Sequence, residues 1–320
     1  MDKIKYILTL LNLPGVGRKS VYKVLKIKNS IPKYGDDIVE EITYLKERIK
    51  RLKIPTRNEV QKAVDKAQEI IDKSLLERIA IIPITDERFP EKLAKYSDPP
   101  VIIYVKGDIN CLKNDPAIAV IGTREPTEYG AECCNKISQN IAEHNITIIS
   151  GLAKGCDSIA HRACLEKNCI TIAILAHGLH MIYPAENKEL AQKIIDSGGC
   201  LVSEYPIGTE PRPNYFIERD RLQTALSNAV FFAETDIKGG TMHAVKACIA
   251  EGKPLACLKH PEKWLTYEKT KGNQILISEK KAIPIADVKD LELFLTKKMF
   301  ETRDNSISNK VLKYKQLELF

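Results

Sequence analysis

The sequence lacks the features by which several protein classes are recognised. It has no run of about 18 apolar residues, so it offers no membrane-spanning helix. The N-terminal residues Met1, Asp2 and Lys3 have no signal-peptide character. No G-x-x-x-x-G-K-[S/T] occurs, and no G-x-G-x-x-G follows the first strand of the predicted sheet. We therefore expect a cytoplasmic protein that neither hydrolyses ATP on a P-loop nor binds NAD in the usual way.

Cysteine is absent from the first third of the chain and forms no C-x-x-C pair. All nine cysteines lie at or after Cys111, several of them in apolar runs. A structural zinc site needs four closely spaced ligands, and the sequence has no such cluster. An odd number of apolar-flanked cysteines predicts buried free thiols in a reducing compartment. We expect no metal and no other cofactor.

Positive charge is unevenly distributed along the chain. The 320 residues include 49 Lys and Arg against 42 Asp and Glu, a net charge of +7. Residues 1–78 hold 18 of the positive and 11 of the negative charges, so the whole excess lies there. Residues 79–320 are neutral overall. Such a shift indicates that residues 1–78 form a separate module.

The first module begins with a predicted helical hairpin. Residues 4–13 are apolar at helical spacing, and a Pro-Gly-Val-Gly-Arg-Lys turn leads into a second amphipathic stretch. Its two glycines allow a sharp turn that leaves amide groups free at the start of the second helix. This pattern resembles the helix-hairpin-helix motif. It predicts phosphate contacts by Gly15, Gly17, Arg18 and Lys19; the alternative is a structural hairpin with solvated cations.

Short apolar strands then alternate with helical stretches. We expect strands at 79–84, 101–105, 117–121, 146–149, 170–176, 200–203, 229–233, 255–258 and 283–285. Helical periodicity is found at 131–143, 158–167, 188–197 and 241–251. This alternation predicts an α/β fold with a doubly wound, mostly parallel sheet over residues 79–290.

Unusual residues follow the strands at one edge of the predicted sheet. Gly151 and Gly155 flank a turn that opens a helix, and Gly239-Gly240-Thr241 repeats this arrangement. Converging backbone amides at such turns can hold a phosphate, and Arg124 and Lys154 add charge. His161 is either a packing residue or part of this site. His177 and His180 have no nucleophile paired with them by spacing, so we predict no enzymatic activity.

The order of motifs resembles the DNA-processing protein A family (DprA, also called Smf). The matching segments are Gly122-x-Arg124, Ser150-Gly151-x-Ala153-x-Gly155-x-Asp157, Ala160-His161, Tyr183-Pro184-x-x-Asn187, Ser203-Glu204-Tyr205-Pro206, Phe216-x-x-Arg219-x-Arg221 and Gly272-Asn273. The resemblance covers about residues 79–285. It implies an extended Rossmann-like domain in a non-enzymatic, dimeric single-stranded DNA-binding protein. Such a protein protects incoming strands and loads the RecA recombinase during DNA uptake, natural transformation and recombination.

The resemblance also implies which residues bind DNA. They are Arg124, Ser150, Gly151, Lys154, Gly155, Arg219, Arg221, Gly240 and Thr241. Phe216 is expected in the core, with stacking on a base as the alternative. Asp220 departs from the family's Asn and either weakens phosphate contact or pairs with an arginine.

Residues 291–320 are predicted to be a basic tail. Its last five residues, Gln316-Leu317-Glu318-Leu319-Phe320, resemble the peptide that docks on the bacterial replication sliding clamp. In that role Leu317, Leu319 and Phe320 fill apolar pockets and Gln316 donates and accepts hydrogen bonds. The alternative is a segment that packs on the protein's own core.

A second function remains open from the sequence. The Gly-Gly-Thr loop also resembles that of nucleotide phosphoribohydrolases on a related fold, which implies a nucleotide sensor or nucleotide hydrolase. That chemistry expects a glutamate shortly after Thr241, where this chain has Met242, His243, Ala244 and Val245.

Overall fold

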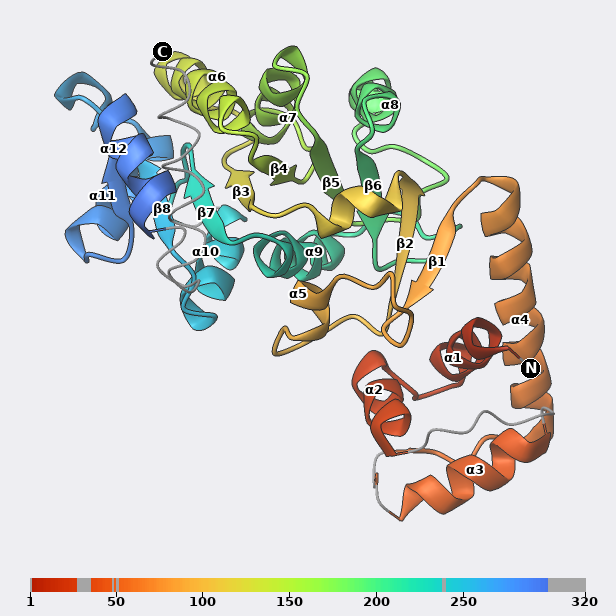
Figure 1. The fold of residues 1–320 in the computed structure, drawn as a ribbon. Coiled ribbons are helices and arrows are strands. Elements are labelled where there is room, and N and C mark those ends of the chain that lie inside the picture. The colour runs from red at the N-terminus through yellow and green to blue at the C-terminus, as the bar shows by residue number, and fades with distance from the viewer. Residues whose placement is uncertain (1, 28–35, 48, 50–51, 238–239, 299–320) are drawn as a thin grey trace. The chain divides into compact units, whose positions relative to one another are not determined.

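The computed structural model describes residues 2–27, 36–47, 49, 52–237 and 240–298 (Figure 1). Its contacts divide the chain into two compact units. The first unit comprises Met1–Lys106, His177–Met181 and Val202–Glu210, and the second comprises Gly107–Ala176, Ile182–Leu201 and Pro211–Phe320. The predicted boundary after residue 78 stays a prediction.

The first unit begins with the helices α1 (Lys3–Asn12), α2 (Arg18–Ile27), α3 (Asp36–Lys46) and α4 (Arg57–Leu76). Local signals fix their ends: the Asp2 side chain accepts from the Lys5 amide at 2.8 Å, and Thr56 and Glu59 form a capping box on α4. The helices share an apolar core, within which the Tyr6 hydroxyl donates to Glu41 at 2.9 Å. The predicted helical hairpin is confirmed as α1 and α2.

The same unit contains a β-hairpin. Strand β1 (Ala80–Pro83) pairs antiparallel with β2 (Ile102–Gly107), with Ala80 opposite Val105 and Pro83 opposite Ile102. The short helix α5 (Glu91–Ala94) lies between the two strands in the chain. Strand β6 (Cys200–Ser203) lies where the two units divide along the chain.

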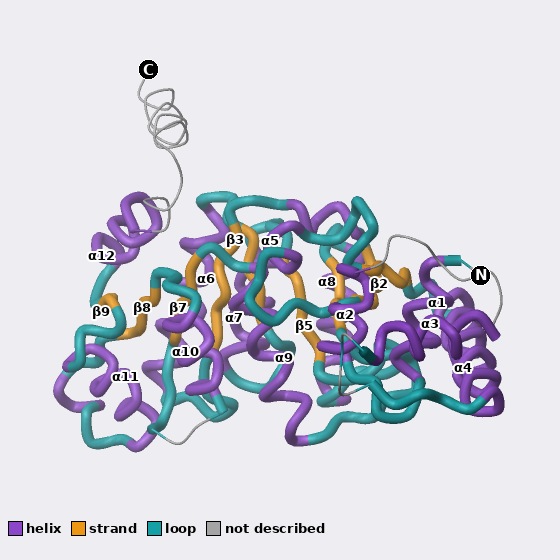
Figure 2. The backbone as a smooth tube through the Cα atoms, turned by 90° about the horizontal axis from the view of Figure 1, so that it is seen from below, coloured by secondary structure: helices purple, strands orange, loops and turns teal. Residues whose placement is uncertain are grey.

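A parallel sheet forms the centre of the second unit. Its strands are β3 (Ala117–Ile121), β4 (Thr147–Ser150), β5 (Thr171–Leu175), β7 (Ala229–Phe232), β8 (Leu255–Leu258) and β9 (Ile283–Ile285). They lie in the order β5-β4-β3-β7-β8-β9, and each neighbouring pair is parallel (Figure 2). The order reverses direction between β3 and β7, as a doubly wound sheet requires, so the predicted fold class is confirmed.

Helices cover both faces of this sheet. They are α6 (Glu128–Glu143), α7 (Cys156–Glu166), α8 (Lys188–Asp196), α9 (Pro213–Leu226), α10 (Thr241–Ala250), α11 (Glu268–Ser278) and α12 (Val288–Leu293), followed by a π-helical turn, Phe294–Lys298. Figure 1 shows α6 and α7 on one face and α9 and α10 on the other.

Side chains alternate between two cores. Ile118, Val120 and Phe231 face residues of α6, α7 and α12, while Ile121 and Phe232 face α10 and α11. Leu291, Phe294 and Leu295 also belong to the first of these cores, so ordered packing continues past the predicted domain end at residue 290.

Two further expectations concern the state of the cysteines and membrane-spanning helices. All nine cysteines are free, seven are buried, and Cys133 and Cys169 are half-buried, which largely confirms the predicted buried thiols. Among the described residues, no helix has both the length and the apolar character needed to cross a bilayer.

Candidate functional site

A cleft of about 420 Å³ lies beyond the C-terminal ends of β3, β4 and β7, all within the second unit. We call it the strand-end cleft. Its lining residues are Ile121, Gly122, Thr123, Arg124, Glu125, Ala153, Asp157, Phe216, Arg219, Asp220, Thr235, Asp236, Gly240, Thr241 and Lys269. Ligands of doubly wound sheets bind at this edge, where the strand order reverses. Of the predicted DNA-binding residues, Arg124, Arg219, Gly240 and Thr241 line this cleft.

An arginine and an aromatic ring meet in the strand-end cleft. Arg124 is exposed, and its Cζ lies 5.2 Å from the centroid of the Phe216 ring. Phe216 is half-buried and also contacts the Tyr183 ring at 5.9 Å. The expected core position of Phe216 is therefore wrong. Phe216 and Arg219 are three residues apart on α9, so they share the helix face that borders the cleft.

Arg219 lies at the floor of the cleft and is only 5% exposed. Its guanidinium lies 3.9 Å from Asp157 and 3.5 Å from Asp220. When the Gln223 amide is oriented by its donors, its oxygen accepts from Arg219 Nη1 at 2.6 Å and from the Gly151 amide at 2.8 Å. A Cβ on Gly151 would lie 1.5 Å from Nη1, so only glycine leaves room for this arginine.

Two carboxyl groups share this buried environment. Burial raises the pKa of Asp220 from its usual 3.8 to about 7, against the opposing effect of Arg219. Burial also raises the pKa of Asp157, again opposed by Arg219. Of the two readings of Asp220, the geometry supports pairing with an arginine, because its carboxyl is nearest to the Arg219 guanidinium.

The loop between β4 and α7 differs from the predicted phosphate cradle. The Cys156 amide donates to the Thr123 carbonyl and the Ser158 amide to the Ala153 carbonyl, both at 3.1 Å. The Ala153 amide donates to Asp157 at 3.3 Å. These amides already have protein partners, so they do not converge on an anion. The loop instead attaches the residues after β3 to α7.

The glycine and serine of this loop are structural. Ser150 is fully buried, and its hydroxyl donates to the Val120 carbonyl at 2.6 Å, so it does not face the cleft as predicted. Gly155 has φ +70°, and a Cβ there would lie 2.5 Å from the carbonyl oxygens of Thr123 and Arg124. Both residues hold the loop in shape.

Lys154 extends the site toward a second, smaller hollow. This hollow is lined by Arg124, Gly151, Ala153, Lys154, Tyr183, Pro184 and Phe216. The Lys154 side chain is exposed, and its Nζ lies 2.8 Å from Glu186. Arg124 and Phe216 border both the hollow and the strand-end cleft, so Lys154 and Arg124 line one continuous surface.

The remaining predicted residues lie on α9 and α10. Gly240 and Thr241 line the strand-end cleft, and a Cβ on Gly240 would meet nothing within 4 Å. Gly239 lies outside the described residues. Arg221 is half-buried on α9 and is not among the residues that line the cleft.

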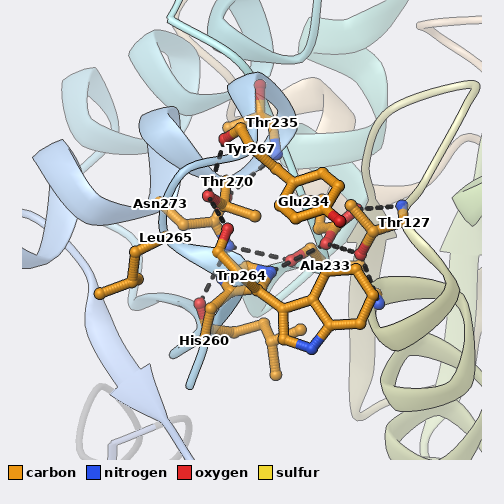
Figure 3. Close-up of polar contacts among 12 residues, drawn as sticks. Thr127, Ala233, Glu234, Thr235, His260, Trp264, Leu265, Tyr267, Thr270 and Asn273 are labelled. Carbon is orange, nitrogen blue, oxygen red and sulfur yellow. Dashed lines mark hydrogen bonds and ion pairs between the residues drawn. The ribbon is translucent and has the colours of Figure 1, made fainter. Parts of the chain in front are cut away.

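A buried polar network that the sequence did not reveal supports the cleft (Figure 3). Glu234 is fully buried two residues after the end of β7, and it accepts from the amide and hydroxyl of Thr127 at 2.7 and 2.6 Å. Its carboxylate also lies 2.9 Å from His260 Nε2, and its carbonyl accepts from the Thr123 amide at 2.8 Å. Glu234 thus fixes both ends of the segment that carries Arg124. The only sequence signal for Glu234 was its position directly after the predicted strand at 229–233.

The candidate histidines differ in their surroundings. His161 is fully buried, its Nδ1 lies 2.7 Å from Thr171 Oγ1, and burial lowers its pKa to about 3. It is therefore a neutral packing residue. In the first unit, His177 is buried with Nδ1 3.0 Å from the Gly178 carbonyl, and His180 accepts from the Gly208 amide at 3.2 Å.

The helical hairpin of the first unit places its two cations differently. Arg18 lies 2.6 Å from Asp98 and 3.1 Å from Glu204, so it is held by two carboxylates of its own unit. The Lys19 side chain is 78% exposed, and its Nζ lies 3.9 Å from Asp98. Gly15 has φ +74°, which the turn requires, and a Cβ on Gly17 would meet nothing. Lys19, more than Arg18, is available to a phosphate.

The predicted clamp-docking residues Gln316, Leu317, Leu319 and Phe320 lie outside the described residues.

The fold and the strand-end cleft define a doubly wound α/β protein whose cleft at the strand ends combines cations with an aromatic ring. The family model of DNA recombination-mediator protein A matches residues 80–296, which is more than half of the chain. The chain belongs to this family.

Several relatives and solved structures are similar to this chain. Protein Smf of Escherichia coli is 32% identical over 57% of this chain and 48% of its own length. The DNA processing protein DprA of Bacillus subtilis is 31% identical over 62% of this chain and 66% of its own length. The chain thus spans about half the length of the first of these relatives and two thirds of the second.

Two solved structures share the fold. DNA processing protein A from Helicobacter pylori, described with a unique single-stranded DNA binding mode, matches with a TM-score of 0.61 and 29% identity over 68% of this chain and 96% of that one. DNA processing protein A from Streptococcus pneumoniae matches with a TM-score of 0.66 and 24% identity over 87% of this chain and 97% of that one.

Proposed function

We propose that this protein binds single-stranded DNA in the strand-end cleft. The observation that carries the proposal is the Arg124–Phe216 pair at the mouth of a cleft whose floor is a buried arginine. An exposed guanidinium beside a half-exposed ring suits a phosphate and the base attached to it. Lys154, on the adjoining hollow, supplies the next cation along the surface.

The cleft explains how a domain of zero net charge binds a polyanion. A few cations at fixed positions are enough, because each neutralised phosphate of a single strand contributes about 0.7 to the slope of log affinity against log salt. Asp157 and Asp220 hold the Arg219 guanidinium at the floor of the cleft, so Arg124 and Lys154 are the cations most available to the strand.

The proposal extends to the macromolecules with which this protein would interact. The family is named for recombination mediation, and this supports a role in protecting single strands and loading a RecA-type recombinase. A homodimer, docking of residues 316–320 on the sliding clamp, and double-stranded DNA binding through Lys19 belong to the same proposal.

A mutant series tests the site. Arg124→Ala and Lys154→Ala should each weaken binding of a labelled 20-nucleotide oligo-dT, Arg124→Ala by about tenfold, because a charge-assisted contact contributes about 1.5 kcal/mol or more. Fluorescence anisotropy over a salt series measures both the affinity and the salt slope, which should fall by about 0.7 per lost contact.

Lys136→Ala is the matched control. Its side chain is 69% exposed and lies outside the cleft on α6, paired with Glu132. It should bind like the unmodified protein. Unchanged affinity in both Arg124→Ala and Lys154→Ala would contradict the proposed site.

The nucleotide-hydrolase alternative is tested separately. The cleft volume suits a mononucleotide, which is the observation that keeps this alternative. Incubation with nucleoside monophosphates followed by chromatography would detect a free base. If the unmodified protein releases the base and Thr241→Ala does not, the result would favour the alternative over the proposal.

A further inference from the structure

A cluster of three aromatic side chains, one exposed and two half-buried, joins α6 to the segment between β8 and α11, outside the residues assigned above. Tyr129, Trp264 and Tyr267 form it, and we call it the aromatic platform (Figure 3 shows Trp264 and Tyr267). The Tyr129 and Trp264 rings are stacked at 5.9 Å with an interplanar angle of 20°. Trp264 and Tyr267 are 5.0 Å apart. Tyr267 is 49% exposed and the neighbouring Leu265 is 36% exposed.

The platform is held in place by hydrogen bonds to its backbone. Thr270 Oγ1 lies 3.0 Å from the Trp264 carbonyl and 2.9 Å from the Tyr267 carbonyl. The Gln274 amide donates to the Leu265 carbonyl at 2.8 Å. Thr270 is fully buried on α11, so the segment is fixed to a regular element. Rigid rings lose little conformational entropy when a flat ligand stacks on them.

The segment that carries Trp264 and Tyr267 has more lysines than acidic residues. Residues 259–271 contain four lysines and two glutamates. Lys263 Nζ lies 5.1 Å above the Trp264 ring. Lys269, two residues after Tyr267, lines the strand-end cleft, where its Nζ lies 3.7 Å from Asp236. Lys269 is thus the cleft residue that lies nearest along the chain to Tyr267 of the platform.

We propose that the aromatic platform is a second single-stranded DNA contact, on which bases stack after the strand leaves the strand-end cleft past Lys269. This inference rests on the proposed function of the cleft. Aromatic rings interleaved with lysines suit a single strand, because every base has a face that stacks and the phosphates meet the charges. Duplex DNA keeps its bases stacked internally and offers no face to these rings.

The chain contains a built-in reporter for this contact. Trp264 is the only tryptophan of the sequence, so its fluorescence reports on the platform alone. We expect oligo-dT of about 4–6 nucleotides to bind, by anisotropy, without quenching Trp264. Oligomers of about 15–20 nucleotides should quench it, and a duplex of the same length should not.

A substitution gives the second measurement. Tyr267→Ala should weaken binding of the long oligomer by about fivefold or more and leave the short one unchanged, because stacking on one aromatic ring is lost. Tyr267→Phe keeps the ring and should bind like the unmodified protein. Tyr44→Ala, at a half-exposed tyrosine of the first unit, is the control and should change neither affinity.

The outcomes separate this inference from the proposal on which it rests. Long oligomers that bind in an Arg124-dependent way without quenching Trp264, together with unchanged affinity in Tyr267→Ala, would overturn the platform and leave the cleft standing. Absence of any oligomer binding would overturn both. If Tyr267→Ala instead changes the oligomeric mass in light scattering while DNA affinity stays constant, the platform is a contact between copies of the chain and the inference fails.

Discussion

At the scale of single residues, the strand-end cleft balances cations against carboxylates. Arg219 lies between Asp157 and Asp220, so a buried positive charge is offset by two acids. Such an arrangement fixes the guanidinium but reduces its attraction for phosphate. Because burial raises the pKa of Asp220 to about 7, its negative charge is the part of the balance that changes near neutral pH.

The sign of this change gives a prediction on pH. Asp220 is ionised at pH 8 and mostly protonated at pH 6, so lowering the pH removes a negative charge from the cleft. Arg219 and Arg124 oppose the raised pKa and Asp157 adds to it. Affinity for oligo-dT should therefore rise by about fivefold from pH 8 to pH 6, since charges ~8 Å apart at an effective dielectric constant of about 40 interact by ~1 kcal/mol.

Asp220→Asn is the matched variant, because the amide has the same shape and no charge. It should bind at pH 8 about as tightly as the unmodified protein does at pH 6, with a flatter pH profile. Anisotropy titrations at constant ionic strength measure both. An equal pH slope in the two proteins would assign the effect to another group.

At the scale of elements, apolar runs predicted the strands well. The helices α9 and α11 were not predicted, because buried polar residues interrupt their apolar helical period. Strands β3, β6, β8 and β9 begin and end at the predicted residues, since each is a short continuous apolar run. The sequence of α9 lacks a clear helical period of apolar residues, because its inward face carries Arg219, Gln223 and Thr224. Helix α11 likewise buries Thr270 and Asn273.

The same contrast applies to the site. Glycines at strand ends predicted the edge of the sheet at which the cleft lies. The sequence could not show that the amides of the β4–α7 loop pair with carbonyls, or that Phe216 borders the cleft, because both depend on contacts between distant segments.

Asn273 shows how a buried polar residue on α11 joins elements. It is fully buried; its amide group donates to the carbonyls of Ala233 and Leu258 at 2.9 and 3.0 Å, and its oxygen accepts from the Thr235 amide at 3.0 Å. Asn273→Ala should lower the free energy of unfolding by about 2–4 kcal/mol, because three buried backbone groups lose partners. A lower urea midpoint with an unchanged m-value measures this.

Ser278→Ala is the control for this loss. Ser278 lies at the end of α11, and its hydroxyl donates to the Ile275 carbonyl of the same helix. Its urea midpoint should stay close to that of the unmodified protein. If the two variants unfold at the same midpoint, the three hydrogen bonds of Asn273 do not stabilise the ends of β7 and β8.

At the scale of the whole molecule, the net positive charge and the cations of the strand-end cleft lie in different parts of the chain. Residues 1–78 carry the whole excess of +7, whereas the cleft belongs to a region that is neutral overall. Bulk charge attracts any nucleic acid, and placed cations beside an aromatic ring favour a single strand. The two parts should therefore differ in the form of DNA that they prefer.

Point substitutions separate these two surfaces without removing residues that the first unit needs for packing. Lys19→Ala should weaken binding of a 20-base-pair duplex by about two- to fivefold and lower its salt slope by about 0.9, since one phosphate contact to B-DNA is lost. Lys19→Ala should leave binding of a short single strand unchanged. Arg124→Ala should weaken binding of the single strand and leave binding of the duplex unchanged.

Lys66→Ala, at an exposed lysine on α4 that pairs with Glu69, is the control. Filter binding of the duplex and of the single strand over a salt series measures the affinity and the salt slope of each variant. If Lys19→Ala and Lys66→Ala bind duplex equally, the helical hairpin is a structural element and the excess charge of residues 1–78 acts only at long range.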